Sequence, residues 1–175
     1  MVFAIAMRVD EMRVLSGDDA PLWGVISFDI DSHAFPGVGW KDFLGSVVGS
    51  FVTALSELVR GRKSAWVYFF NGSFQLVLER RGVSAARRGA RASGGDEVTV
   101  IALYDPAVEE YVEEARCSVS LEELLVTLRG AVQEILEEGR RRSITGMGMD
   151  VMKGNLKHLD DLASRLSTSA AQNTN

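Results

Sequence analysis

The chain has 175 residues, of which 46% are hydrophobic and 25% are charged, the composition of one globular domain with a core of its own. The 24 acidic and 19 basic residues leave a net charge of −5, which argues against a protein built to hold nucleic-acid phosphates. The single cysteine excludes an internal disulfide and favours a reducing compartment, so we expect a cytoplasmic protein; no stretch predicts a membrane span.

The first part of the chain predicts two strands. Residues 2–9 form an apolar run of strand length. Residues 22–30 alternate, and the apolar even positions are Leu22, Ile26, Phe28 and Ile30. The odd positions hold a mixture of apolar and polar residues, so the second strand is expected to have one buried face.

Acidic residues and a histidine mark the end of the second strand. Asp29, Asp31 and His33 alternate, and alternate residues on a strand point to one side, where they could hold a divalent metal. The same three residues also fall on the positions that should face solvent, at the point where the strand ends. A metal-dependent enzyme or small-ligand-binding protein is therefore the alternative, while a solvated strand end with no cofactor is the interpretation we favour.

The spacing of apolar residues changes at Trp40. From there to Val59 they recur every three or four positions, which predicts a helix with a broad apolar face. Gly61 is suited to end this helix.

A β-hairpin is predicted over 64–80, because two strand-like runs flank Asn71-Gly72, the pair that best supplies the positive φ angles of a type I′ turn. This turn pairs the inward residues Phe69 with Phe74, Val67 with Leu76, and Ala65 with Leu78. The other face carries Trp66, Tyr68 and Phe70, which is too large an apolar surface to remain exposed to solvent. We expect the C-terminal helix, a second copy of the chain or a partner to cover it.

Residues 83–96 are small, basic and glycine-rich and predict a loop. Strands follow at 97–104 and 108–118, and the second has the polar composition of a sheet edge. Its inward positions are Tyr111, Ala115 and Cys117. The cysteine is therefore predicted to be a buried structural thiol.

The segment from Asp105 to Glu114 is densely acidic, with Tyr111 and Val112 as apolar anchors. Its acidic residues are Asp105, Glu109, Glu110, Glu113 and Glu114. Such a patch could imitate a phosphate backbone toward a basic protein. An edge strand that resists aggregation has the same composition, so both interpretations stay open.

Two helices complete the chain. Ser120 and Glu123 form a capping box, and the helix that it begins continues to Gly139. A shorter helix is predicted over 151–166, before a polar tail at 167–175 that is expected to be disordered. This order predicts an α+β fold: an antiparallel sheet of about five to six strands with two to three helices packed mainly on one face, in a single domain over 1–166.

The chain resembles small bacterial immunity proteins of polymorphic or contact-dependent toxin systems in four features. These are a strand ending in Phe35-Pro36, Trp40-x-Asp42-Phe43 opening an apolar helix, the hairpin Tyr68-Phe69-Phe70-Asn71-Gly72-Ser73-Phe74, and a late helix after a Cys-containing strand. The resemblance covers roughly residues 20–140. It implies an α+β, cytoplasmic, non-enzymatic protein that occludes a cognate toxin domain, but it assigns no binding residue. The basic loop at 83–96 departs from it.

No catalytic set is visible in the sequence, since neither His33 nor His158 has the context of a triad. We therefore expect a non-catalytic protein-binding module, an immunity-type inhibitor whose partner is a protein such as a basic toxin domain. The predicted partner-binding residues are Glu109, Glu110, Tyr111, Glu113 and Glu114 on the acidic strand and Trp66 and Tyr68 on the hairpin. Neither a membrane nor a nucleic acid is expected as a partner, and a homodimer stays open.

Overall fold

A computed structural model describes residues 3–15, 20–81, 97–107 and 110–172. Within these residues the strands form two antiparallel sheets, and three helices lie against them. The first sheet contains β1 (Phe3–Val14), β2 (Leu22–Ile30), β3 (His33–Phe35) and β4 (Lys41–Phe43). The second contains, in spatial order, β5 (Ser64–Tyr68), β6 (Phe74–Arg80), β7 (Glu97–Tyr104) and β8 (Val112–Ser120).

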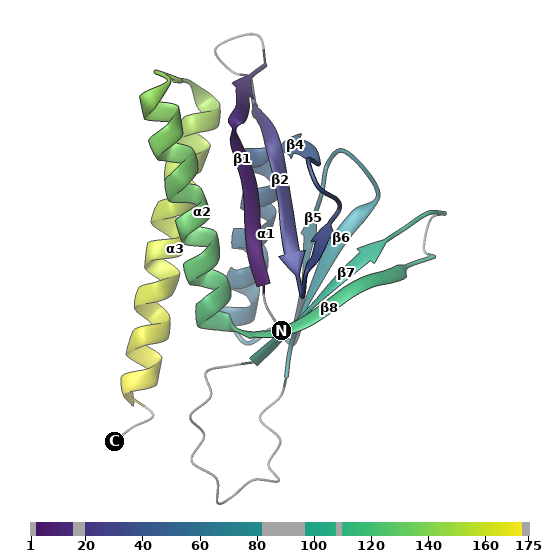
Figure 1. The fold of residues 1–175 in the computed structure, drawn as a ribbon. Coiled ribbons are helices and arrows are strands. Elements are labelled where there is room, and N and C mark those ends of the chain that lie inside the picture. The colour runs from purple at the N-terminus through teal and green to yellow at the C-terminus, as the bar shows by residue number, and fades with distance from the viewer. Residues whose placement is uncertain (1–2, 16–19, 82–96, 108–109, 173–175) are drawn as a thin grey trace, which may run out of the picture.

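The helices are α1 (Leu44–Val59), α2 (Leu121–Arg141) and α3 (Met147–Gln172). The first packs on β5 and β2, α2 packs on β1, and α3 packs on α1 and α2 (Figure 1). The α+β class expected from the sequence is confirmed. The strands, however, form two sheets of four where one sheet of five or six was expected, because β1, β3 and β4 pair with β2 while β5 to β8 pair among themselves.

The predicted strand at 22–30 matches β2, but the chain turns directly after it. Ile30 pairs with His33, and the two residues between them, Asp31 and Ser32, have φ angles of 54° and 72°. Positive φ at both central residues is the signature of a type I′ turn. The Ser32 amide also donates to Asp29 Oδ1 at 2.8 Å, so Asp29 caps the turn.

Helix α1 begins at Leu44, four residues later than the spacing predicts. Lys41–Phe43 instead forms β4, which pairs with Trp23, Gly24 and Val25 of β2. Trp40 therefore belongs to the loop before this short strand. The predicted end of the helix is confirmed, because Gly61 has a φ of 93° just beyond it.

The register of the β5–β6 hairpin is confirmed. Ala65 pairs with Leu78 and Val67 with Leu76, and the Phe69 amide donates to the Phe74 carbonyl at 3.2 Å. The predicted type I′ turn is wrong, because neither Asn71 nor Gly72 has a positive φ. The amides at the hairpin tip are held by a side chain from another part of the chain.

That side chain is Asp42, which is completely buried. Its carboxylate accepts four N–H groups: Phe43 N at 2.7 Å, Trp40 Nε1 at 3.2 Å, Phe70 N at 3.0 Å and Asn71 N at 3.1 Å. A buried carboxylate is stable only where donors replace the water it has lost. Asp42 therefore ties β4 of the first sheet to the hairpin tip of the second.

Aromatic rings fill the space between the two sheets. Phe69 lies 5.6 Å from both Phe28 and Phe35, measured between ring centroids, and all three are buried. Phe35 in turn lies 5.6 Å from Phe74, and Trp40 lies 4.9 Å from the same ring. These edge-to-face contacts form one aromatic seam, which joins the two sheets into one core.

Helix α2 begins where the sequence predicts, whereas α3 is longer than predicted at both ends. The Glu123 amide donates to Ser120 Oγ at 3.0 Å, which confirms the cap of α2. Helix α3 starts at Met147 and continues to Gln172, so most of the tail expected to be disordered at 167–175 is helical. Residues 173–175 lie outside the described residues. The predicted loop at 83–96 lies outside them as well.

The thiol of Cys117 on β8 is 1% exposed, as the inward phase predicts. Burial, with a smaller contribution from the Asp31 and Glu123 carboxylates, raises its pKa from 9.0 to about 11.

We expect the Cys117 thiol to resist a thiol reagent at pH 8 in the folded protein and to react once urea unfolds the chain. The unfolded thiol ionises first as the pH rises. The free energy of unfolding should therefore fall between about pH 9 and pH 11, and Cys117→Ala should remove this part of the pH dependence. Rapid labelling of the folded chain would contradict the buried position.

Candidate protein-binding face

The β5–β8 sheet has one face on the core and one that looks outward. Ala65, Val67, Leu76 and Val100 lie on the core face and are buried. The strand registers place the outward residues in rows, of which the central one is Trp66, Val77, Ile101 and Arg116. The next row is Tyr68, Gln75, Leu103 and Glu113.

Aromatic side chains stay exposed on this outward side. Trp66 is 36% exposed, Tyr68 47%, Phe70 53% and Tyr111 47%. We call these four residues the aromatic face. Isolated exposed apolar residues are ordinary, but four aromatic side chains on one sheet face form the kind of patch that marks an interaction surface.

Trp66 and Tyr111 meet across the sheet. Their ring centroids lie 5.9 Å apart, although Trp66 belongs to one edge strand and Tyr111 directly precedes the other. Edge strands of a four-stranded sheet are about 14 Å apart, so both rings must lean inward over the central strands. This explains why Val77 and Ile101, which point outward, are each only 6% exposed. The ring pair is thus a preformed part of the surface.

Tyr111 reaches the outward side because β8 contains a bulge. Ala115 pairs with Ala102, but the next pair is Glu113 with Leu103, so Glu114 has no partner in the ladder. The extra residue reverses the alternation. The inward position expected for Tyr111 is therefore wrong, while those of Cys117 and Ala115 are retained.

The acidic residues of the predicted site differ in their surroundings. Glu113 makes two bonds to Arg116, at 2.9 and 2.6 Å, and this partner lowers the pKa of the Glu113 carboxyl. Glu114 Oε2 lies 3.7 Å from His33 Nε2 on β3. Glu110 is exposed beside Tyr111, and Glu109 lies outside the described residues. The edge position of β8 is confirmed.

Helix α3 does not provide the cover that was one expectation for the aromatic face. It packs on α1 and α2, which lie on the core side of the strands (Figure 1). The expectation of a covering C-terminal helix is therefore wrong, and a second copy or a partner remains.

The alternative metal site is not assembled. Asp31 lies in the turn and not on the strand, Asp29 caps that turn, and His33 contacts Glu114. Within the ranges that the structure describes, no three His, Cys, Asp or Glu side chains are grouped so that they could hold a metal ion.

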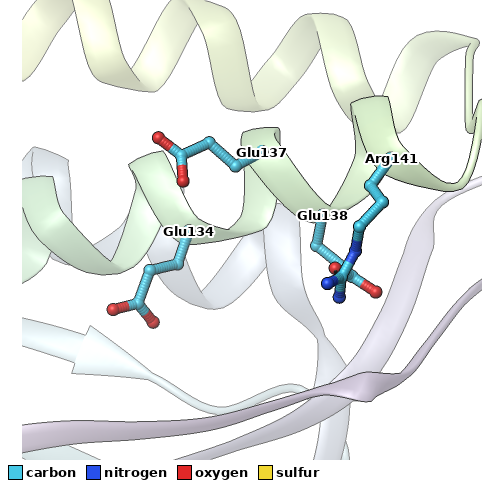
Figure 2. Close-up of a pocket in the computed structure, with 4 residues that line it drawn as sticks. All are labelled: Glu134, Glu137, Glu138 and Arg141. Atoms are coloured by element: carbon cyan, nitrogen blue, oxygen red, sulfur yellow. Dashed lines mark hydrogen bonds and ion pairs between the residues drawn. The ribbon is translucent and has the colours of Figure 1, made fainter.

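A hollow on α2 is lined by Glu134, Glu137, Glu138 and Arg141 (Figure 2). Glu138 is 6% exposed and forms ion pairs with Arg141 and Arg142, the latter at 2.5 Å. Arg142 also donates to the Met12 carbonyl at 3.0 Å. Glu138 therefore holds Arg142 in place, and Arg142 links the end of α2 to β1.

Three basic residues next to the aromatic face were not singled out from the sequence. Arg60, Arg62 and Lys63 are exposed in the connection between α1 and β5. The sequence feature that could have identified them is their clustering directly around Gly61, where the helix ends.

Comparison of the chain with family models, with curated proteins and with solved structures found no match in any of the three. None of the helices in the described ranges combines the length and apolar character needed to span a bilayer.

Proposed function

We propose that the chain is a non-catalytic protein-binding module, an immunity-type inhibitor that acts in the bacterial cytoplasm by occluding a cognate toxin domain. The observation that carries this proposal is the aromatic face, with four side chains that are 36–53% exposed on one side of a rigid sheet. Aromatic residues on a preformed surface are the usual anchors of protein interfaces. The resemblance in layout to immunity proteins supports the same class of function.

Tyr111 is the proposed anchor and Glu110 the proposed steering charge. The ring of Tyr111 is already held by Trp66, so little side-chain freedom is lost when a partner covers it. Glu110 is exposed at the rim, where charge changes the rate of encounter more than the strength of the final contact. A basic toxin domain is the partner that such a rim favours.

The two residues should therefore act on different rate constants. Glu110→Lys should lower the association rate with a basic toxin domain, and added salt should slow the wild type more than this variant. Tyr111→Ala should raise the dissociation rate, at a cost of about 2 kcal/mol. Surface plasmon resonance at several salt concentrations measures both, with Asp161→Lys on α3, which makes the same change in net charge as Glu110→Lys, as the remote control. An association rate that ignores salt and charge reversal would show that the acidic strand is only a protected edge.

The function itself is tested by co-expression with the products of adjacent genes. If one of them arrests growth, this chain should restore growth, and Trp66→Ser together with Tyr111→Ala should abolish the protection while the variant stays folded. If no neighbouring product is toxic, or if the double variant protects as well as the wild type, the proposed inhibitor function of this face is wrong.

A further inference from the structure

The aromatic face has opposite charges at two of its corners. Arg60, Arg62 and Lys63 lie where β5 begins, and no ion pair of theirs occurs within the described part of the chain. Glu110 lies exposed where β8 begins, and the Glu114 carboxylate, 3.7 Å from His33 Nε2 of the first sheet, lies at the same corner. One corner of the sheet is therefore basic and another acidic.

These two corners are diagonally opposed. Strands β5 and β8 are the two edges of the sheet, and three successive antiparallel pairings make them run in opposite directions. The start of β5 and the start of β8 consequently lie at opposite ends as well as at opposite edges. The ring pair of Trp66 and Tyr111 lies between them.

A surface with this charge arrangement is complementary to itself. A twofold axis in the plane of contact, perpendicular to the line between the corners, brings the basic corner of one copy onto the acidic corner of the other. The same rotation brings the two aromatic faces together. A second copy pairs both corners at once, whereas a basic toxin domain would engage the acidic corner alone.

We propose that the aromatic face binds a second copy of this chain, forming a twofold dimer in which Trp66, Tyr68 and Tyr111 are central and the charged corners pair at the rim. The dimer covers the apolar surface that the described helices leave exposed. It also occupies the face assigned above to a toxin partner, so dimer formation and toxin capture exclude each other. The inference does not depend on the toxin, since it concerns the purified chain alone.

The test uses two charge-reversed variants of the whole chain. One carries Arg62→Glu and Lys63→Glu, so that both corners are acidic; the other carries Glu110→Lys and Glu114→Lys, so that both are basic. Sedimentation equilibrium should show a dimer for the wild type and dimerisation weakened by about tenfold or more for each variant alone, because like charges then meet at the rim. An equimolar mixture of the two should form a heterodimer with nearly the wild-type affinity.

Controls separate the contact from general charge effects. Lys157→Glu with Arg165→Glu on α3 makes the same change in net charge as the first variant and should leave the dimer intact. Trp66→Ser should weaken the dimer, and mixing this variant with either charge-reversed variant should not restore the wild-type affinity. A wild type that stays monomeric, a dimer that survives both reversals, or a mixture that does not pair would each overturn the proposal, and none of these results bears on growth protection by the chain.

Discussion

Asp42→Ala is expected to lower the free energy of unfolding by about 3 kcal/mol, as measured by urea denaturation followed by circular dichroism. The wild-type carboxylate is completely buried and accepts four N–H groups, two of them from the hairpin tip. Alanine leaves these donors without an acceptor and removes the link between the two sheets.

Asp150→Ala is the matched control. Asp150 is exposed and pairs with Lys153 at 2.8 Å on the surface of α3, so its removal should change the free energy of unfolding by less than about 0.5 kcal/mol. Asp42→Asn should lie between the two, because its amide oxygen still accepts while its NH₂ group faces other donors. Equal stability of the Asp42 and Asp150 variants would show that water replaces the carboxylate without cost.

Phe69→Ala is expected to cost about 4 kcal/mol, the usual range for removing a buried phenyl ring. The ring of Phe69 lies at the centre of the aromatic seam, 5.6 Å from both Phe28 and Phe35. Its loss leaves a cavity between the two sheets that these rigid neighbours cannot close.

The neighbouring residue provides the control in this case. Phe70 carries the same side chain but is 53% exposed, so Phe70→Ala should cost less than about 1 kcal/mol. Dilute protein must be used for both variants, because self-association stabilises the folded state by mass action. Similar losses for Phe69→Ala and Phe70→Ala would contradict the seam.

The hairpin shows which part of the fold could be predicted from the sequence. Its register follows from the alternation of two adjacent strands, which is a local property. Its turn was predicted wrongly, because the tip is bonded to Asp42, 28 residues before Phe70 in the sequence. A single sequence carries no sign of that contact, and the type I′ geometry occurs instead at Asp31-Ser32.

The candidate site was predicted as separate parts. The exposed aromatic residues of β5 followed from the hairpin pattern, and the acidic residues of the edge strand from composition. That Tyr111 meets Trp66 depends on one unpaired residue, Glu114, in β8. The sequence 111–117 alternates equally well without a bulge, so the side to which Tyr111 points could not be read from it.

The bulge at Glu114 divides β8 into two lengths of strand that obey different constraints. After it, Cys117 and Val119 are locked into the core, and a change there alters packing throughout the domain. Before it, the residues at positions 110–113 are all exposed, so their replacement leaves the core as it was. New side chains can therefore be tried at this end of the strand without loss of folding, and the contacts that the chain makes with other molecules are free to diversify faster than its architecture.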